Sequence, residues 1–148
     1  MYMFSHCYSL SKIIGLSDLN TENVMYFDNM FSHCYSLKSI DILHFNTKSY
    51  SSLNNMFSGC YSLTSIDLSI FKNKKYPEYN GLFYDCPNLK YVNISIFSLN
   101  LGKFNEIFNK NISSSGTLII NEEYYNYYID EYEFYIPSNW AIIFESKI

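Results

Sequence analysis

One stretch of the sequence decides the fold: Leu53-Asn-Asn-Met56-Phe57-Ser-Gly-Cys60-Tyr-Ser-Leu63-Thr-Ser-Ile66-Asp67-Leu68-Ser-Ile-Phe71. Similar stretches stand before and after it, at 30–42 and 82–94, and a shorter one opens the chain at 3–10. Each contains a cysteine, at position 7, 34, 60 or 86, so the repeat length is first 27 and then 26 residues. A period of this size is typical of proteins in which each unit is covered by its neighbours.

The first half of each repeat predicts a short helix. Its apolar residues recur at i, i+3, i+4 and i+7, the spacing of one helix face. In three copies these residues are Leu53, Met56, Phe57 and Cys60; Phe27, Met30, Phe31 and Cys34; and Tyr79, Leu82, Phe83 and Cys86. A fourth copy, at 104–111, keeps only three of the four apolar positions.

The second half of each repeat predicts a strand, because Ile66 and Leu68 alternate with polar residues. The same pattern occurs at 40–42, 92–94 and 117–121, and in the first repeat only if one residue is inserted near Ile14 and Gly15. We therefore expect an α/β repeat solenoid, leucine-rich-repeat-like, with short parallel strands on one face and short helices on the other. It would span residues 1–121 in four to five units, and 122–148 would form a capping helix and strand.

The amino-acid composition excludes several classes of protein and partner. The chain of 148 residues is 48% hydrophobic and 20% aromatic, which is too apolar for a disordered protein, and no apolar run is long enough to span a membrane. All ten basic residues are lysine and the net charge is −4. Since arginine supplies the bidentate contacts that read guanine and phosphate, nucleic acid is not an expected partner.

The repeat resembles the unit of BspA-like leucine-rich repeat surface proteins, in its lipoprotein-type variant. The residues that carry the resemblance are Met56-Phe57-Ser-Gly-Cys60-Tyr-Ser-Leu63-Thr-Ser-Ile66-Asp67-Leu68-Ser69-Ile-Phe71 and Met30-Phe31-Ser-His-Cys34-Tyr-Ser-Leu37-Lys-Ser-Ile40-Asp41. The stretch 136–144 resembles the closing segment of that family. The resemblance implies a secreted or surface-anchored, adhesin-like protein that binds host or neighbouring-cell proteins and has no catalytic residues.

Two residue sets are candidates for protein binding, and each has a purely structural alternative. The first would point outward from the strands and line the open face of the sheet. Its members are Ser39, Asp41, Ser65, Asp67, Tyr91 and Asn93. The second follows the cysteines and would form a column along one edge. Its members are Tyr8, Tyr35 and Tyr61. The first set could instead be only a hydrated face, and the second could serve only to stack unit on unit.

The cysteines and histidines do not predict a catalytic or metal site. One cysteine per unit spreads the four too widely for one zinc ion, so we expect a ladder of buried free thiols; disulfides between adjacent units are the alternative. His6 and His33 occupy equivalent positions, with Gly59 and Asp85 in later copies, which suggests exposed turns, and His44 stands alone. We expect no enzyme, cofactor or metal.

Two functional hypotheses follow. The first is a non-enzymatic protein-binding module. The second is a structural protein that associates through the apolar end of its first repeat. Residues 1–7 show no signal peptide, so we expect a cytoplasmic protein if Met1 is the true start. If the chain is instead part of a longer one, the resemblance implies a location outside the cell, on its surface or secreted.

Overall fold

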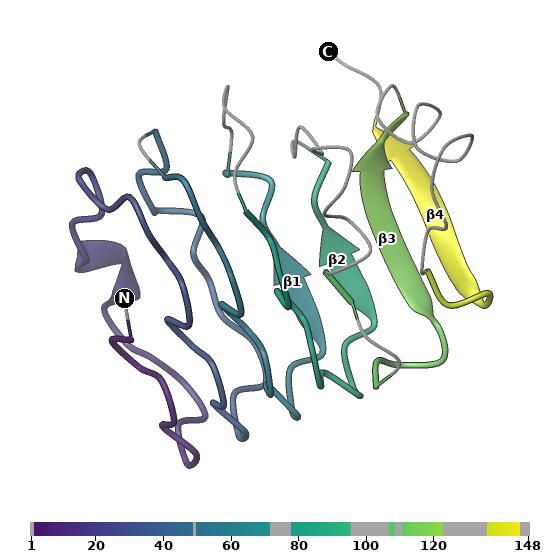
Figure 1. Ribbon diagram of the computed structural model, residues 1–148, viewed down its shortest axis with the longest axis horizontal. Coiled ribbons are helices and arrows are strands. Elements are labelled where there is room, and N and C mark those ends of the chain that lie inside the picture. Colours follow the sequence, from purple (N-terminus) through teal and green to yellow (C-terminus); the bar gives the residue numbers. More distant parts are fainter. Residues whose placement is uncertain are drawn as a thin grey trace.

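A parallel sheet of short strands forms the regular part of the molecule. The computed structural model describes residues 2–48, 50–71, 78–95, 107–108, 111–122 and 136–145. Its strands are β1 (Ser65–Asp67), β2 (Tyr91–Asn93), β3 (Gly116–Asn121) and β4 (Trp140–Glu145), in the order β1-β2-β3-β4 (Figure 1). Ile66 lies beside Val92, and Val92 beside Leu118, so neighbouring strands are offset by one repeat of 26 residues. The strands expected around Ile66, at 92–94 and at 117–121, and the strand expected in the cap, are confirmed by β1, β2, β3 and β4 in turn.

The strands expected in the first two repeats do not form. Figure 1 shows no strand arrow in either repeat; the second repeat lies beside the unit of β1, and the first lies beyond the second. Directly before β1, Thr64 N–H donates to Lys38 O of the second repeat, at 3.1 Å. Beyond it no further backbone bond joins described residues 39–42 to β1, although Ile42 is buried as the alternation predicted.

The expectation of a leucine-rich-repeat-like α/β solenoid with short helices is wrong. The described residues form a small domain with a four-stranded parallel sheet and almost no helix. Its one complete helical element in the described part of the chain is the 3-10 turn η1 (Leu16–Asp18). The segments 27–34, 53–60 and 79–86, which were expected to be helical, are successions of turns. The helix expected at the start of the cap lies beyond Glu122, outside the described residues.

Left-handed residues exclude a helix from these turn segments. Each contains two residues with positive φ, four positions apart. They are Asn29 and His33, Asn55 and Gly59, and Gly81 and Asp85, with φ between 54° and 72°. An α-helix needs φ near −63° throughout, so a left-handed residue in every turn prevents it. Glycine, asparagine, aspartate and histidine are the types that adopt this conformation most readily.

The turn segments use their backbone donors alternately within and between repeats. Phe27, Asn29, Phe31 and His33 donate to carbonyls 25 residues ahead in the next repeat, at 2.7–3.0 Å. Between them, Met30 N–H and Ser32 N–H donate to the carbonyl three positions back, as in β-turns. The pattern repeats from Leu53 to Gly59. In the copies at 27–34, 53–60 and 79–86 every apolar position of the i, i+3, i+4, i+7 pattern is still buried, so these predicted core residues are correct although the helix is not.

Aromatic rings stack through the core from repeat to repeat. The rings of Phe4, Phe31, Phe57, Phe83 and Phe108 follow one another at centroid distances of 5.4, 5.5, 6.0 and 5.6 Å. Trp140 on β4 closes the stack, 5.7 Å from Phe108, and its indole N–H donates to Ser113 O. A second buried group contains Phe27, Phe45 and Phe71.

We predict that Gly59→Ala lowers the free energy of unfolding by about 1–3 kcal/mol. Gly59 has φ +72°, and an added Cβ would overlap His33 Nδ1. Urea unfolding measures the loss, and Asp85→Asn, which keeps a residue type suited to positive φ, is the matched control and should change little. In a His33→Gly background the cost of Gly59→Ala should fall to the backbone contribution alone. An equal cost in both backgrounds would show that the imidazole does not restrict this position.

Candidate functional site

The tyrosines that follow the cysteines form the expected column. The ring centroids of Tyr8 and Tyr35, and those of Tyr35 and Tyr61, are 4.7 Å apart, with interplanar angles of 30° and 14°. Tyr8 is 50% exposed and Tyr61 41%, so the column lies at the surface. The preceding left-handed residue reverses the chain, and Tyr8 N–H and Tyr61 N–H each donate two residues back, to His6 O and Gly59 O. The turn thereby directs each ring outward.

Two histidines widen this column into what we call the aromatic strip: Tyr8, Tyr35, Tyr61, His6 and His33. The His6 and His33 rings lie 4.7 Å apart, and each meets the tyrosine two residues later edge-on at 5.8 Å. Desolvation, and then repulsion from Tyr61 and Tyr8, raises the pKa of Tyr35. The equivalent positions of His6 and His33 had predicted exposed turns, without a contact between the two rings. Their recurrence two residues before the tyrosines was the signal that the rings pack together.

The candidates on the strand side are mostly engaged in local structure. Asp41, Asp67 and Asn93 each accept the backbone N–H two residues ahead, at 3.0, 2.8 and 3.1 Å, in Asx turns that end the extended segment. Asn93 is buried and its Nδ2 donates to Asp67 at 3.4 Å. Ser65 and Tyr91 lie side by side in β1 and β2, and Tyr91 is 38% exposed.

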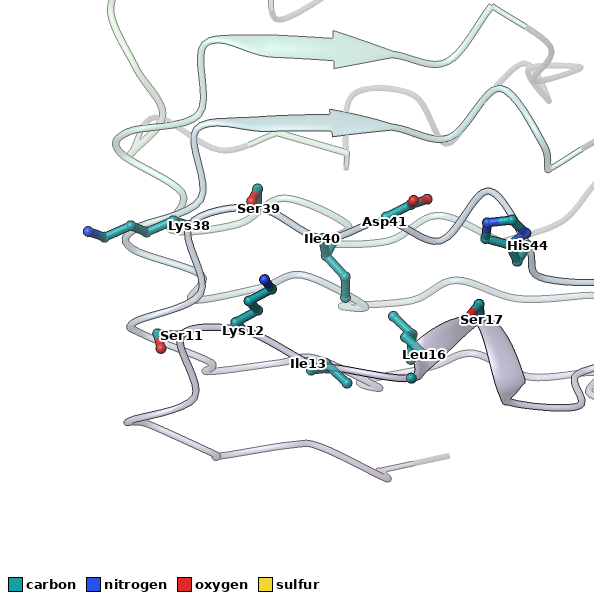
Figure 2. Close-up of a pocket in the computed structure, with 11 residues that line it drawn as sticks. Ser11, Lys12, Ile13, Leu16, Ser17, Lys38, Ser39, Ile40, Asp41 and His44 are labelled. Atoms are coloured by element: carbon teal, nitrogen blue, oxygen red, sulfur yellow. The ribbon is translucent and has the colours of Figure 1, made fainter.

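A groove that the sequence analysis did not anticipate lies between the first two repeats. Its volume is about 540 Å³, and Figure 2 shows it between the extended segments at 11–17 and 38–44. The structure thus brings Ser39 and Asp41 together with side chains from the first repeat. Lys12, Lys38 and His44 also line it, with Ile13, Ile40 and Leu16 as apolar lining. The sequence signal was the extra residue near Ile14 and Gly15.

The cysteines form a ladder of free thiols, as expected, except at its first member. Cys34, Cys60 and Cys86 are buried, whereas Cys7 is exposed. Each buried thiol donates to a carbonyl of the preceding repeat: Phe4 O, Phe31 O and Phe57 O, at 3.1–3.2 Å. Burial is the main cause that raises the pKa of Cys34 to about 11 and that of Cys86 to about 12, and it raises the pKa of Cys60 as well. These thiols are protonated at neutral pH and therefore poor nucleophiles.

Within the described ranges, no three histidine, cysteine, aspartate or glutamate side chains are placed to share a metal ion. The same part of the chain contains no helix with the length and apolar character needed to cross a bilayer.

Comparison with known proteins gives one match. Residues 1–116 fit the model of a family described as "Mycoplasma protein of unknown function, DUF285". Neither the curated proteins nor the solved structures contain a match to the chain.

We predict that the buried thiols make the protein less stable at alkaline pH. An unfolded thiol releases its proton near pH 9, whereas the folded state holds those of Cys60 and Cys86 to higher pH. The stabilising effect is therefore complete below about pH 9 and is lost as the pH rises, by up to about 1.4 kcal/mol per pH unit for each thiol. Urea unfolding between pH 8 and pH 11 measures the slope.

The control is the same titration on Cys60→Ala/Cys86→Ala, because lysine and tyrosine titrate in this range too. The slope should be flatter in the double variant, and equal slopes would contradict the assignment. As an independent check, iodoacetamide on the native protein should modify Cys7 and spare the three buried thiols until urea is added.

Proposed function

Because this chain belongs to the DUF285 family, whose function is unknown, we propose its role from its geometry: a non-enzymatic protein-binding module that uses the aromatic strip. The observation that supports this proposal is the surface column of Tyr8, Tyr35 and Tyr61, stacked at 4.7 Å. Tyrosine supplies a large amphipathic contact area with few rotatable bonds, and it is enriched at protein interfaces.

The strip is also pre-ordered for binding. Each tyrosine follows a left-handed residue in a turn that is bonded to the next repeat, and it stacks on its neighbours. Side chains that are already ordered lose less entropy when a partner binds. The strip lies on exposed turns, whereas small-molecule sites are concave and enclose most of the ligand. A protein surface is therefore the better-suited partner.

The resemblance to BspA-like surface proteins extends this proposal. It favours an adhesin-like role on the outside of a cell, with a host or neighbouring-cell protein as partner. The three tyrosines belong to the repeats that carry the resemblance, at the position directly after each cysteine. Binding through repeated, equally spaced rings would suit a large partner surface better than a single small ligand.

A second candidate function is self-association through the first repeat. In later repeats the residue equivalent to Met3 accepts a backbone bond: Met30 O from Phe4 N, and Met56 O from Phe31 N, both at 3.0 Å. Met3 O has no such donor among the described residues, and the Met3 side chain is 49% exposed. A repeat from a second copy of the chain would continue both the backbone ladder and the phenylalanine stack there.

We predict that Tyr35→Ala/Tyr61→Ala weakens partner binding by at least about tenfold without a matching loss of stability. Peptides selected from a random phage-displayed library on the immobilised wild-type protein serve as probes, and fluorescence polarisation measures their affinities. Tyr91→Ala, which removes an exposed tyrosine from the strand side, is the matched control. If the double variant instead lowers the melting temperature and binds the selected peptides normally, the column serves only to stack the repeats.

For self-association, we predict that the mass measured by light scattering increases with protein concentration and that Met3→Asp abolishes the increase. An aspartate there would place a charge on the apolar outer face of the first repeat. Ile143→Asp is the control, because it places the same charge at a 48% exposed position on β4, in the last part of the sheet. A monomer at every concentration would rule this function out.

A further inference from the structure

We propose that the groove between the first two repeats binds an extended peptide segment, which inserts between them as an additional parallel strand. The ligand class is a short peptide with an acidic residue near its N-terminus and a basic residue near its C-terminus. This site is distinct from the aromatic strip, and the proposal does not depend on the strip's function.

The hydrogen bonding between the first two repeats is interrupted along the groove. At the start of the groove, Ser36 N–H and its hydroxyl both donate to Tyr8 O, at 3.2 and 2.8 Å. The next bond between the two repeats is Asn46 N–H to Thr21 Oγ1, at 2.6 Å. Between these points no hydrogen bond joins described residues 9–20 to 37–45. The peptide groups of 11–14 and 39–41, which make no hydrogen bond to one another or within local turns, are thus available to a strand, as at an open sheet edge.

The first repeat differs from the others in its length. It is one residue longer than the others, and Gly15, at φ +75°, leads into η1. The bond Leu19 N–H to Leu16 O closes η1 as Phe45 N–H to Ile42 O closes the equivalent turn of the second repeat. The chain returns to register at Leu16, which is buried like its equivalent Ile42. The Ile14 side chain, in contrast, is 89% exposed. The first repeat therefore accommodates its extra residue at the surface of the wall, while the core stays in place.

Side chains of opposite charge lie toward the two ends of the groove. Figure 2 shows Lys12 and Lys38 toward one end and Asp41 and His44 toward the other, with Ser39 between them. A strand parallel to the walls would begin beside the lysines and end beside Asp41. An acid at its start and a base at its end would be complementary to these groups. The volume of about 540 Å³ lies within the usual range of ligand sites.

Fluorescence polarisation with a fluorescein-labelled peptide of sequence ESISIK tests the proposal on the full chain. We expect saturable binding, weakened about tenfold for the charge-reversed peptide KSISIE. A peptide with a central proline, ESPSIK, should also bind more weakly, because proline removes a backbone donor. Equal affinity for ESISIK and KSISIE, or no binding of ESISIK, would overturn the proposal.

Two variants test the site itself. Deletion of Ile14 restores the 26-residue spacing, so it should close the groove and abolish binding; unchanged binding by the folded deletion variant would contradict the proposal. If that variant does not fold, Lys12→Glu/Lys38→Glu replaces it, because both lysines are exposed and their exchange should remove the preference for ESISIK over KSISIE. An unchanged preference for ESISIK would count equally against the proposal. Tyr35→Ala/Tyr61→Ala should bind ESISIK normally, which separates this site from the aromatic strip.

Discussion

Hydrogen bonds between the backbones of successive turn segments hold this molecule together. In the segments at 27–33 and 53–59 every second N–H donates to the next repeat, and N–H groups between them, such as those of Met30 and Met56, close turns within their own repeat. The left-handed residues make this alternation possible, because a helix would direct all donors along its own axis. Buried backbone groups need partners, so a segment that is not helical must find them in its neighbours. Each repeat consequently depends on the one beside it.

Equivalent side chains of adjacent repeats are stacked in the same order as their backbones. Because the backbones of adjacent repeats are directly bonded, equivalent side chains lie at the distance at which aromatic rings stack, and the phenylalanines form a continuous column through the core. Cysteine suits its position for a related reason. Its thiol is small and apolar enough for the core, yet it donates to a carbonyl of the preceding repeat, as Cys60 does to Phe31 O. Alanine would fill part of that space without the hydrogen bond.

The amphipathic pattern predicted burial correctly and secondary structure wrongly. Leu53, Met56, Phe57 and Cys60 all point into the core, as the spacing indicated, but consecutive turns produce that spacing as well as a helix does. The residue types at the left-handed positions, such as Asn55, were the available signal against a helix, since they tolerate positive φ. The tyrosine column could be predicted because its position repeats without change. The groove could not, because it arises where the repeat is broken.

The extra residue of the first repeat also shows which side of the molecule tolerates an insertion. The first repeat keeps its turn-side bonds to the second, Phe4 N–H to Met30 O and His6 N–H to Ser32 O, although the two are not bonded on the strand side. The insertion at Ile14 is therefore tolerated, because the turn ladder and the phenylalanine stack hold the units in register. A regular sheet satisfies its own backbone groups and leaves only its side chains and edges for recognition. Where the register is lost, the peptide groups themselves become available, and this makes an irregular repeat a better place for peptide recognition than a regular one.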